Sequence, residues 1–201
     1  MKKEKLSRGR PSRRPQIIAA AKELIGTQGL ANVTTRSIAE QAGCCEAALY
    51  VHFESRLKLL LAVLEESLPE MLVPLQILEQ SVGSSTPLQN LTKAFRAMLA
   101  FHEQVIPMIC GLFADTELLI AYRKSLTDRN KGPQGAIARL QRYIAAEQKL
   151  SRLDKKLDAD IAATTLMATS FFHAFTSQFL NQPKPSNAIL KRIVAAAISS
   201  H

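Results

Sequence analysis

The side chains best suited to chemistry in this chain lie in a short stretch of its N-terminal third. Tyr50 and His52 can donate hydrogen bonds to phosphate oxygens, and Arg36 can reach a phosphate or a base edge. Ala47 and Ala48 allow a close approach, and an alanine methyl group can touch the methyl group of thymine. These residue types favour contact with DNA. Outside this pattern, Tyr50 and His52 would more simply pack on a neighbouring helix.

Residues for covalent or metal chemistry are much weaker candidates. The sequence has no glycine-rich phosphate loop, paired catalytic carboxylates or nucleophile motif. Cys110 with His102 or His173 is the one conceivable nucleophile–base pair, and the spacing gives it no support. Adjacent Cys44 and Cys45 with a distant third cysteine fit neither a disulfide framework nor a zinc site. We therefore expect no catalytic residue, no metal site and no cofactor.

Helices are predicted on both sides of the candidate DNA contacts. Pro15 suits the first turn of a helix whose apolar residues share one face, and Gly29 ends that helix. Thr34 is a good N-cap for a second helix, which Gly43 closes.

The third predicted helix is short, Glu46–His52, and directs Leu49 and Phe53 inward. Ser55 can cap a fourth helix with a regular leucine pattern. The prolines expected to end or kink that helix are Pro69 and Pro74. Two short helices joined by a tight glycine-containing turn are typical of a helix-turn-helix, whose second helix enters the major groove.

The rest of the chain is also predicted to be helical, so the expected fold class is all-α. Residues 82–86 form a linker, and Thr86 followed by Pro87 and Gln89 predicts a capped helix through about Val105. The next helix is expected to begin at Pro107, and another to cover 136–149 after a loop at 127–135. Asp158 is expected to cap the helix that contains the apolar segment Ile161–Leu180, and Ser186 to cap the last helix.

The sequence of residues 33–60, VTTRSIAEQAGCCEAALYVHFESRLKLL, resembles the N-terminal domain of the TetR family of bacterial repressors. The matching elements, in order, are Thr34-Thr35-Arg36, Ile38-Ala39, Ala42-Gly43, Leu49-Tyr50, His52-Phe53, Ser55-Arg56 and Leu59-Leu60. The resemblance covers residues 15–65 by motif, and the remainder only by length and helical layout.

This resemblance implies a DNA-binding domain at 15–62 and a helical effector-binding and dimerisation domain at 63–201. It further implies a homodimer formed through the last two helices, a palindromic double-stranded operator, and a repressor released by a small, largely apolar effector. By position, the residues implied to contact phosphates or to position the domain are Thr34, Thr35, Tyr50, His52 and Arg56. Those implied to face the groove are Arg36, Cys45, Glu46, Ala47 and Ala48.

Three residues at the turn depart from the family pattern. Cys44 and Cys45 replace the usual aliphatic residue and hydroxyl residue, and Glu46 places a negative charge at the groove. Glu46 could accept a hydrogen bond from the amino group of cytosine, although an acid near phosphates weakens general affinity. The two cysteines are interpreted as small residues that fill the turn, with a thiol redox switch as the alternative.

Charge is concentrated in a basic arm, residues 1–14, which we expect to be disordered in the free protein. The arm carries seven Lys or Arg against one Glu, a net charge of +6 out of +9 for the whole chain. Arg8-Gly9-Arg10-Pro11 resembles the core of an AT-hook, so Arg8 and Arg10 could enter a narrow A·T minor groove. A loosely held basic tail that releases counterions is the alternative.

Aromatic and sulfur-containing side chains in the C-terminal part supply candidates for an effector pocket. Core and pocket share this composition, so the sequence does not separate them. The candidates are Phe95, Met98, Phe101, His102, Met108, Phe113, Tyr122, Phe172 and His173. Phe171, Phe175 and Phe179 lie four residues apart and suit helix packing or a dimer seam equally well.

We expect a cytoplasmic protein, because the start of the chain lacks an apolar signal region and no run of about 18 apolar residues predicts a membrane span. The rival interpretation within DNA-binding proteins is an architectural factor without ligand control. A ligand bound inside the C-terminal part would argue against that rival, and sequence-independent binding would support it.

Overall fold

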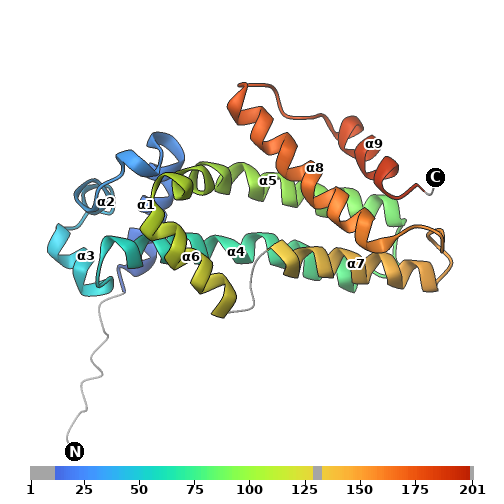
Figure 1. Cartoon of the computed structure of the whole chain (residues 1–201), viewed down its shortest axis with the longest axis horizontal. Helices are drawn as coiled ribbons and strands as arrows, with labels where there is room; N and C mark the ends of the chain where they lie inside the picture. The colour runs from blue at the N-terminus through green and yellow to red at the C-terminus, as the bar shows by residue number, and fades with distance from the viewer. Residues whose placement is uncertain (1–11, 129–132, 200–201) are drawn as a thin grey trace, which may run out of the picture. The chain divides into compact units, whose positions relative to one another are not determined.

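The computed structural model describes residues 12–128 and 133–199, and every regular element in these ranges is a helix (Figure 1). This confirms the all-α prediction. Backbone packing separates two compact units, Met1–Val63 and Leu64–His201, with the boundary inside one long helix.

The first unit contains α1 (Arg14–Gln28), the 3₁₀ turn η1 (Leu30–Asn32), α2 (Thr35–Gln41), α3 (Glu46–His52) and the first turns of α4 (Arg56–Gln80). Helix α1 packs against α2 and α3, and α2 packs against α3. The core of this unit is aliphatic; its most deeply buried side chains include Ile17, Ile25, Ile38, Leu49 and Leu59.

Local chemistry sets the ends of these helices as predicted. Pro15 stands in the first turn of α1, and Gly29 ends it with a φ of 77°. The side chain of Thr34 accepts a hydrogen bond from the backbone N–H of Ser37, and the Ser37 hydroxyl accepts one from the N–H of Thr34. This reciprocal cap satisfies two donors that the first turn of α2 would otherwise leave unpaired.

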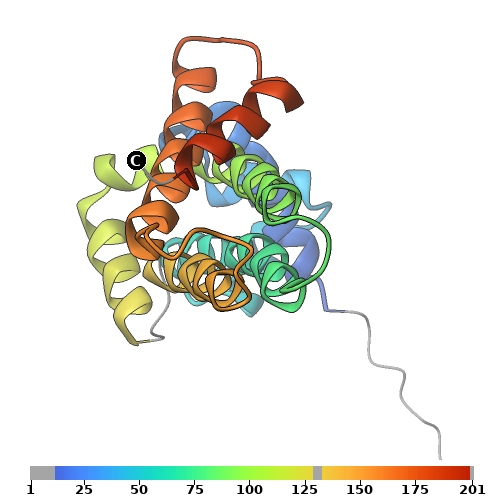
Figure 2. The ribbon, with the colours of Figure 1, turned by 90° about the vertical axis from the view of Figure 1, so that its right-hand side faces the viewer.

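The second unit consists of the rest of α4 with α5 (Pro87–Ala114), α6 (Thr116–Asp128), α7 (Pro133–Lys149), α8 (Ala159–Phe179) and α9 (Asn187–Ala197). Helix α5 is central: it packs against α6, α8 and α9, while α8 also packs against α7 (Figures 1 and 2). The predicted caps Thr86, Asp158 and Ser186 are confirmed, since each side chain accepts hydrogen bonds from the first turn of its helix.

Internal prolines do not end α4 or α5, so the prediction that Pro107 begins a new helix was wrong, as was an end of α4 at Pro69 or Pro74. Helix α4 continues past Pro69 and Pro74 to Gln80, and α5 continues past Pro107 to Ala114 instead of beginning anew. A proline inside a helix costs about 3 kcal/mol, partly because it leaves the carbonyl four residues earlier without its usual donor. In α5 that carbonyl belongs to Glu103, and Nε2 of Gln178 on α8 donates to it instead.

The loop predicted at 127–135 falls partly on residues 129–132, outside the described residues. Helix α7 begins at Pro133, three residues before its predicted start, because proline is well suited to the first helical position. The prediction gave no separate boundaries for α6.

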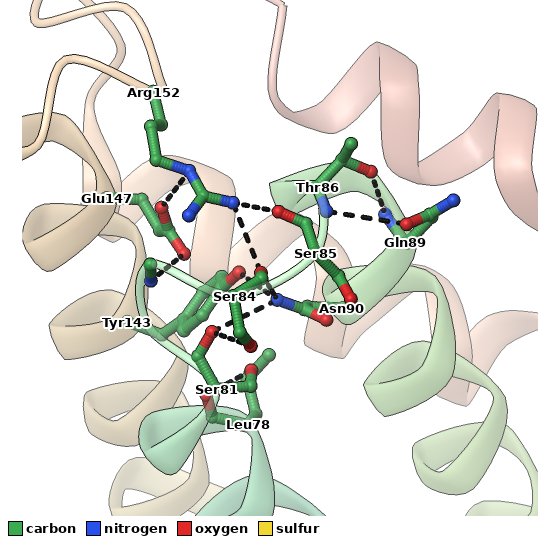
Figure 3. Close-up of polar contacts among 11 residues, drawn as sticks. Leu78, Ser81, Ser84, Ser85, Thr86, Gln89, Asn90, Tyr143, Glu147 and Arg152 are labelled. Atoms are coloured by element: carbon green, nitrogen blue, oxygen red, sulfur yellow. Dashed lines mark hydrogen bonds and ion pairs between the residues drawn. The ribbon is translucent and has the colours of Figure 1, made fainter.

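A buried polar cluster holds the α4–α5 turn against the end of α7 (Figure 3). The carboxylate of Glu147 is fully buried; it accepts a hydrogen bond from the N–H of Gly83 at 3.1 Å and forms an ion pair with Arg152 at 3.1 Å. Nδ2 of Asn90 lies 3.1 Å from the hydroxyl oxygen of Tyr143. Burial raises the pKa of Tyr143 to about 12, with Glu147 adding to the shift, so this phenol stays protonated.

Helix α5 is long and apolar enough to cross a membrane, with a mean hydropathy of 1.4 over its best 18-residue window. The core helix of a helical bundle meets the same length and composition criterion, so this finding does not contradict the expectation of no membrane span. The helix is apolar on several sides because neighbouring helices cover those sides, which suits the core of a helical bundle.

Candidate nucleic-acid interface and apolar cavity

The turn between α2 and α3 is tight and is closed by backbone hydrogen bonds. Gly43 adopts a φ of 65°, its N–H donates to the carbonyl of Glu40 at 3.1 Å, and the N–H of Cys44 donates to that of Ala39 at 2.9 Å. Leu49, fully buried, anchors α3 to the rest of the unit. This geometry is that of a helix-turn-helix, in which the second helix is held rigidly with one face free.

The free face of α3 is small and weakly polar. Glu46, Ala47 and Tyr50 are exposed and Ala48 is half-buried. Val51 is 81% exposed, and the sequence analysis did not select it. Val51 lies four residues after Ala47 and therefore on the same face of the helix, so helical spacing could have identified it as a groove-facing residue. An exposed valine beside alanine suits apolar contact with a thymine methyl group.

Thr35 and Glu46 lie in contact with each other across the two helices. The Thr35 hydroxyl donates to Oε1 of Glu46, so it uses its one hydrogen within the protein. The sequence analysis assigned Thr35 to a phosphate and Glu46 to the groove. In the structure, the hydroxyl of Thr35 holds the side chain of Glu46 in position.

Arg36 and Arg56, assigned by the same resemblance, have different surroundings. Arg36 is largely exposed, and its Nε lies 3.1 Å from a carboxylate oxygen of Glu40 one turn along α2. Such a surface pair is weak, so the guanidinium can exchange this partner for a phosphate. Arg56 is half-buried, and its Nη2 donates to the carbonyls of Leu30 and Val33 at 3.3 and 3.5 Å, which ties α4 to the chain before α2.

Two arginines at the start of α1, which the sequence analysis counted only as part of the basic arm, belong to the folded unit. Nη1 of Arg13 donates to the carbonyl of Gly43 in the turn at 2.8 Å. The guanidinium of Arg14 lies 5.3 Å from the centre of the Phe53 ring. Arg8 and Arg10 lie outside the described residues.

A hollow of about 550 Å³ opens beside α3. Its lining residues are Ser12, Arg13, Gly43, Cys44, Cys45, Ala48, Val51 and His52. Cys45 is exposed and Cys44 half-buried, and both are free thiols. The hollow therefore joins Arg13 and His52 with two of the predicted groove-facing residues, Cys45 and Ala48.

The second unit contains an apolar cavity of about 330 Å³. Its walls come from α4, α5, α6, α7 and α8. The lining residues are Leu64, Met71, Phe101, His102, Val105, Ile109, Leu112, Phe113, Leu119, Tyr122, Arg123, Leu126, Pro133, Met167 and Phe171. A mostly apolar cavity with a few polar groups is the common form of a small-molecule site.

His102 is the buried polar group of this cavity, with only 6% of the residue exposed. Its Nδ1 lies 3.1 Å from the hydroxyl oxygen of Ser170 on α8. The rings of Phe101 and Phe171 stand edge-on to it, each with its centre 5.6 Å away. Burial lowers the pKa of His102 to about 4, so the imidazole is neutral at neutral pH. Burial also raises the pKa of Tyr122 in the same wall, and the charge of Glu65 adds to that shift.

Comparison with known proteins identifies the first unit. Residues 17–63 match the family model described as bacterial regulatory proteins, tetR family. The DNA-binding part of the chain belongs to the TetR family. This confirms the resemblance found in residues 33–60, and the family is one of transcriptional regulators and not of enzymes.

A curated relative of this chain is the nucleoid occlusion factor SlmA of Aliivibrio fischeri (strain MJ11), 41% identical over 63 residues. That match covers 29% of this chain and 32% of the relative, so the chain spans about a third of the relative's length.

Two solved structures share the fold over most of this chain. FadR of Bacillus subtilis, in complex with stearoyl-CoA, has a TM-score of 0.67 at 20% identity, over 92% of this chain and 97% of its own. SmeT, the repressor of the multidrug efflux pump SmeDEF of Stenotrophomonas maltophilia, has a TM-score of 0.61 at 23% identity, over 92% and 86%.

The cavity of the second unit contains four of the nine predicted pocket residues, namely Phe101, His102, Phe113 and Tyr122. Phe95, Met98 and Met108 are buried but do not line it. Phe172 is 61% exposed, and neither it nor His173 lines the cavity. The sequence could not separate these groups, because α5 and α8 carry apolar residues on more than one face.

The cavity residues that sequence reasoning missed are mainly aliphatic, such as Leu64, Ile109 and Leu126. They carry no signal that distinguishes them from core. Within residues 12–128 and 133–199, no three His, Cys, Asp or Glu side chains are grouped closely enough to hold a metal ion.

Proposed function

We propose that this protein is a cytoplasmic transcriptional regulator that binds a palindromic operator as a homodimer and is released by a small, largely apolar effector. The observation that carries the proposal is the free face of α3, where Ala47, Tyr50 and Val51 are exposed on a helix anchored by the buried Leu49. A helix held in this way can enter the major groove without reorganising.

Contacts to DNA divide into two kinds. Tyr50, His52 and Arg36 are placed to donate to phosphates, which fix the position of α3 but carry no sequence information. Ala47 and Val51 present methyl groups to the groove, which favours thymine. The basic arm adds affinity through counterion release, with a strong dependence on salt.

Dimerisation is supported by exposed apolar side chains on the last two helices. Phe172 is 61% and Phe179 74% exposed on α8, and Ile189 is exposed on α9. Phe179 stacks on Phe175 of the same helix, with 5.4 Å between ring centres. Large exposed apolar side chains on two helices that pack together are typical of a subunit interface. Sedimentation of Phe179→Glu should show monomers at concentrations where the wild-type protein is a dimer.

Effector control is supported by the cavity beneath α5 and α8. It is apolar, large enough for a small molecule, and framed by a helix of the proposed dimer interface. An effector that binds best to one arrangement of these helices shifts the population toward that arrangement. Release follows when the two α3 helices of a dimer no longer match successive major grooves.

Fluorescence anisotropy with DNA from the gene's own upstream region tests the DNA-binding part. Wild-type protein should prefer this duplex to a scrambled one, and Tyr50→Ala and Arg36→Ala should weaken the preference. Arg96→Ala is the matched control, because Arg96 is an exposed arginine of α5 in the other unit. Deleting residues 1–11 should make the salt dependence shallower. Equal binding of both duplexes by the wild-type protein would contradict a sequence-specific regulator.

A second candidate is a DNA-binding factor without effector control. It is favoured by the similarity to a nucleoid occlusion factor, whose match extends over 63 residues. Titrating the operator complex with apolar compounds, beginning with stearoyl-CoA and free long-chain alcohols, separates the candidates. Release by any of them at saturable concentration supports the regulator, and persistent specific binding in all cases supports the second candidate.

A further inference from the structure

The hydrogen bonds around His102 indicate which of its two ring nitrogens carries the hydrogen. Ser170 lies between two possible acceptors: its hydroxyl oxygen is 2.8 Å from the carbonyl oxygen of Met167 and 3.1 Å from Nδ1 of His102. A serine hydroxyl has one hydrogen to donate and lone pairs to accept. Both contacts are hydrogen bonds only if the hydroxyl donates to the Met167 carbonyl and accepts from a protonated Nδ1.

The other ring nitrogen, Nε2, is then an unprotonated acceptor. Among the described residues it has no hydrogen-bond partner, and the side chain lines the cavity. Phe101 and Phe171 flank the ring, so no neighbouring aromatic side chain offers it a donor. An acceptor nitrogen in the wall of an apolar cavity is the group that a hydrogen-bond donor of a bound ligand would satisfy.

We propose that the effector is an apolar molecule with a neutral hydroxyl or N–H group that donates a hydrogen bond to Nε2 of His102, and that Ser170 selects for this donor by fixing the tautomer. This inference rests on the proposed function in taking the cavity as the effector site. A carboxylate or ether oxygen at the same place has no hydrogen to donate, so its lone pairs would be repelled by the lone pair of Nε2. The low pKa of His102 agrees with this arrangement, because a neutral ring does not attract an anion.

The tautomer can be tested on the free wild-type protein by long-range ¹H–¹⁵N NMR of histidine-labelled full-length chain. His102→Gln identifies the resonance. The expected spectrum has the hydrogen on Nδ1 and a bare Nε2. A hydrogen on Nε2 would overturn the inference whatever the protein does with DNA.

The donor preference can be tested with 1-naphthol and 1-methoxynaphthalene, which differ in whether the oxygen carries a hydrogen. The chain has no tryptophan, so the fluorescence of these probes can be followed directly. One hydrogen bond to a buried acceptor corresponds to about tenfold tighter binding of 1-naphthol by the wild-type protein. His102→Phe should remove the preference while keeping affinity for 1-methoxynaphthalene, since the cavity stays apolar.

Ser170→Ala provides the sharper variant. Without the serine acceptor the imidazole can place its hydrogen on Nε2, so the preference for 1-naphthol should fall to about twofold or reverse. Ser177→Ala, a serine of α8 outside the cavity lining, should leave the preference unchanged. Far-UV circular dichroism of each variant establishes that it is folded.

The outcomes separate this inference from the proposed function. Equal affinity of wild-type protein for the two probes, or binding of neither at its solubility limit, would overturn the inference. A tenfold preference that depends on Ser170 supports it. If 1-naphthol binds with that preference and no compound releases the operator, the donor site stands and the proposed effector control fails.

Discussion

The buried imidazole of His102 makes the stability of the protein depend on pH in a way that can be calculated. Its pKa is about 4 in the folded protein and 6.5 in an exposed chain, because burial disfavours the charged form. The unfolded chain therefore binds a proton that the folded protein does not, and acid favours unfolding. The stabilising contribution is present above pH 6.5 and is lost as the pH falls from 6.5 toward 4.

The magnitude follows from linkage. Between pH 7 and pH 5, a pKa displacement of this size lowers the free energy of unfolding by about 2 kcal/mol. Domains are typically stable by about 5–15 kcal/mol, so the effect is easily measured. Below pH 4 the loss levels off, because His102 then binds a proton in both states.

Urea unfolding followed by far-UV circular dichroism at a fixed protein concentration measures this effect. His102→Gln keeps an N–H donor for Ser170 but does not titrate. The wild-type protein should lose about 2 kcal/mol more than this variant between pH 7 and pH 5. The subtraction removes the carboxylates and other histidines, which both proteins share. Identical pH dependence in the two proteins would refute the reasoning, since it would mean that His102 accepts a proton in the folded state.

Three further predictions concern stability measured by the same urea titration. Arg152→Met leaves the fully buried Glu147 without its ion-pair partner and should lower the free energy of unfolding by about 3 kcal/mol. Arg36→Met, at an exposed ion pair, should lower it by less than about 1 kcal/mol. Similar losses for the two variants would contradict the role of burial. Removing the N-cap of α8 with D158A should cost about 1 kcal/mol, and no loss would mean that water replaces the cap. Q178A should lower the free energy of unfolding by about 1 kcal/mol in the wild-type background. In a P107A background the loss should be clearly smaller, because the alanine has a backbone N–H that can donate to the Glu103 carbonyl. Additive losses from the two substitutions would argue against this coupling.

Local signals in the sequence predicted local features of the fold. The caps Thr34, Thr86, Asp158 and Ser186 were predictable because each side chain bonds within its own first turn. The prediction of a helix start at Pro107 was wrong because the carbonyl that this proline leaves without a donor is bonded by Gln178, which lies far away in sequence. Propensity gives way to tertiary contacts at such positions.

The candidate sites were predictable to different degrees. The free face of α3 followed from periodicity and family motifs, although contacts between helices, such as Thr35 with Glu46, did not. The cavity was harder because the same residue types fill core and pocket. Phe95 and Phe101 lie on one helix and are both buried, yet only Phe101 lines the cavity. Which side of α5 is left unfilled depends on how α6 and α8 pack, and a single sequence does not contain that information.

The hydrogen bond from Gln178 to the Glu103 carbonyl has a mechanical meaning. Most helix pairs can slide along each other by small steps, because side-chain packing offers many nearly equivalent positions. Here the proline frees a single backbone oxygen on α5, and α8 bonds to it through one amide. Lys184, just beyond α8, pairs with the side chain of the same Glu103 at 2.6 Å. These two contacts hold the C-terminal end of α8 on one residue, so a ligand that displaces the cavity wall would swing the N-terminal end of α8 while the end at Gln178 stays in place.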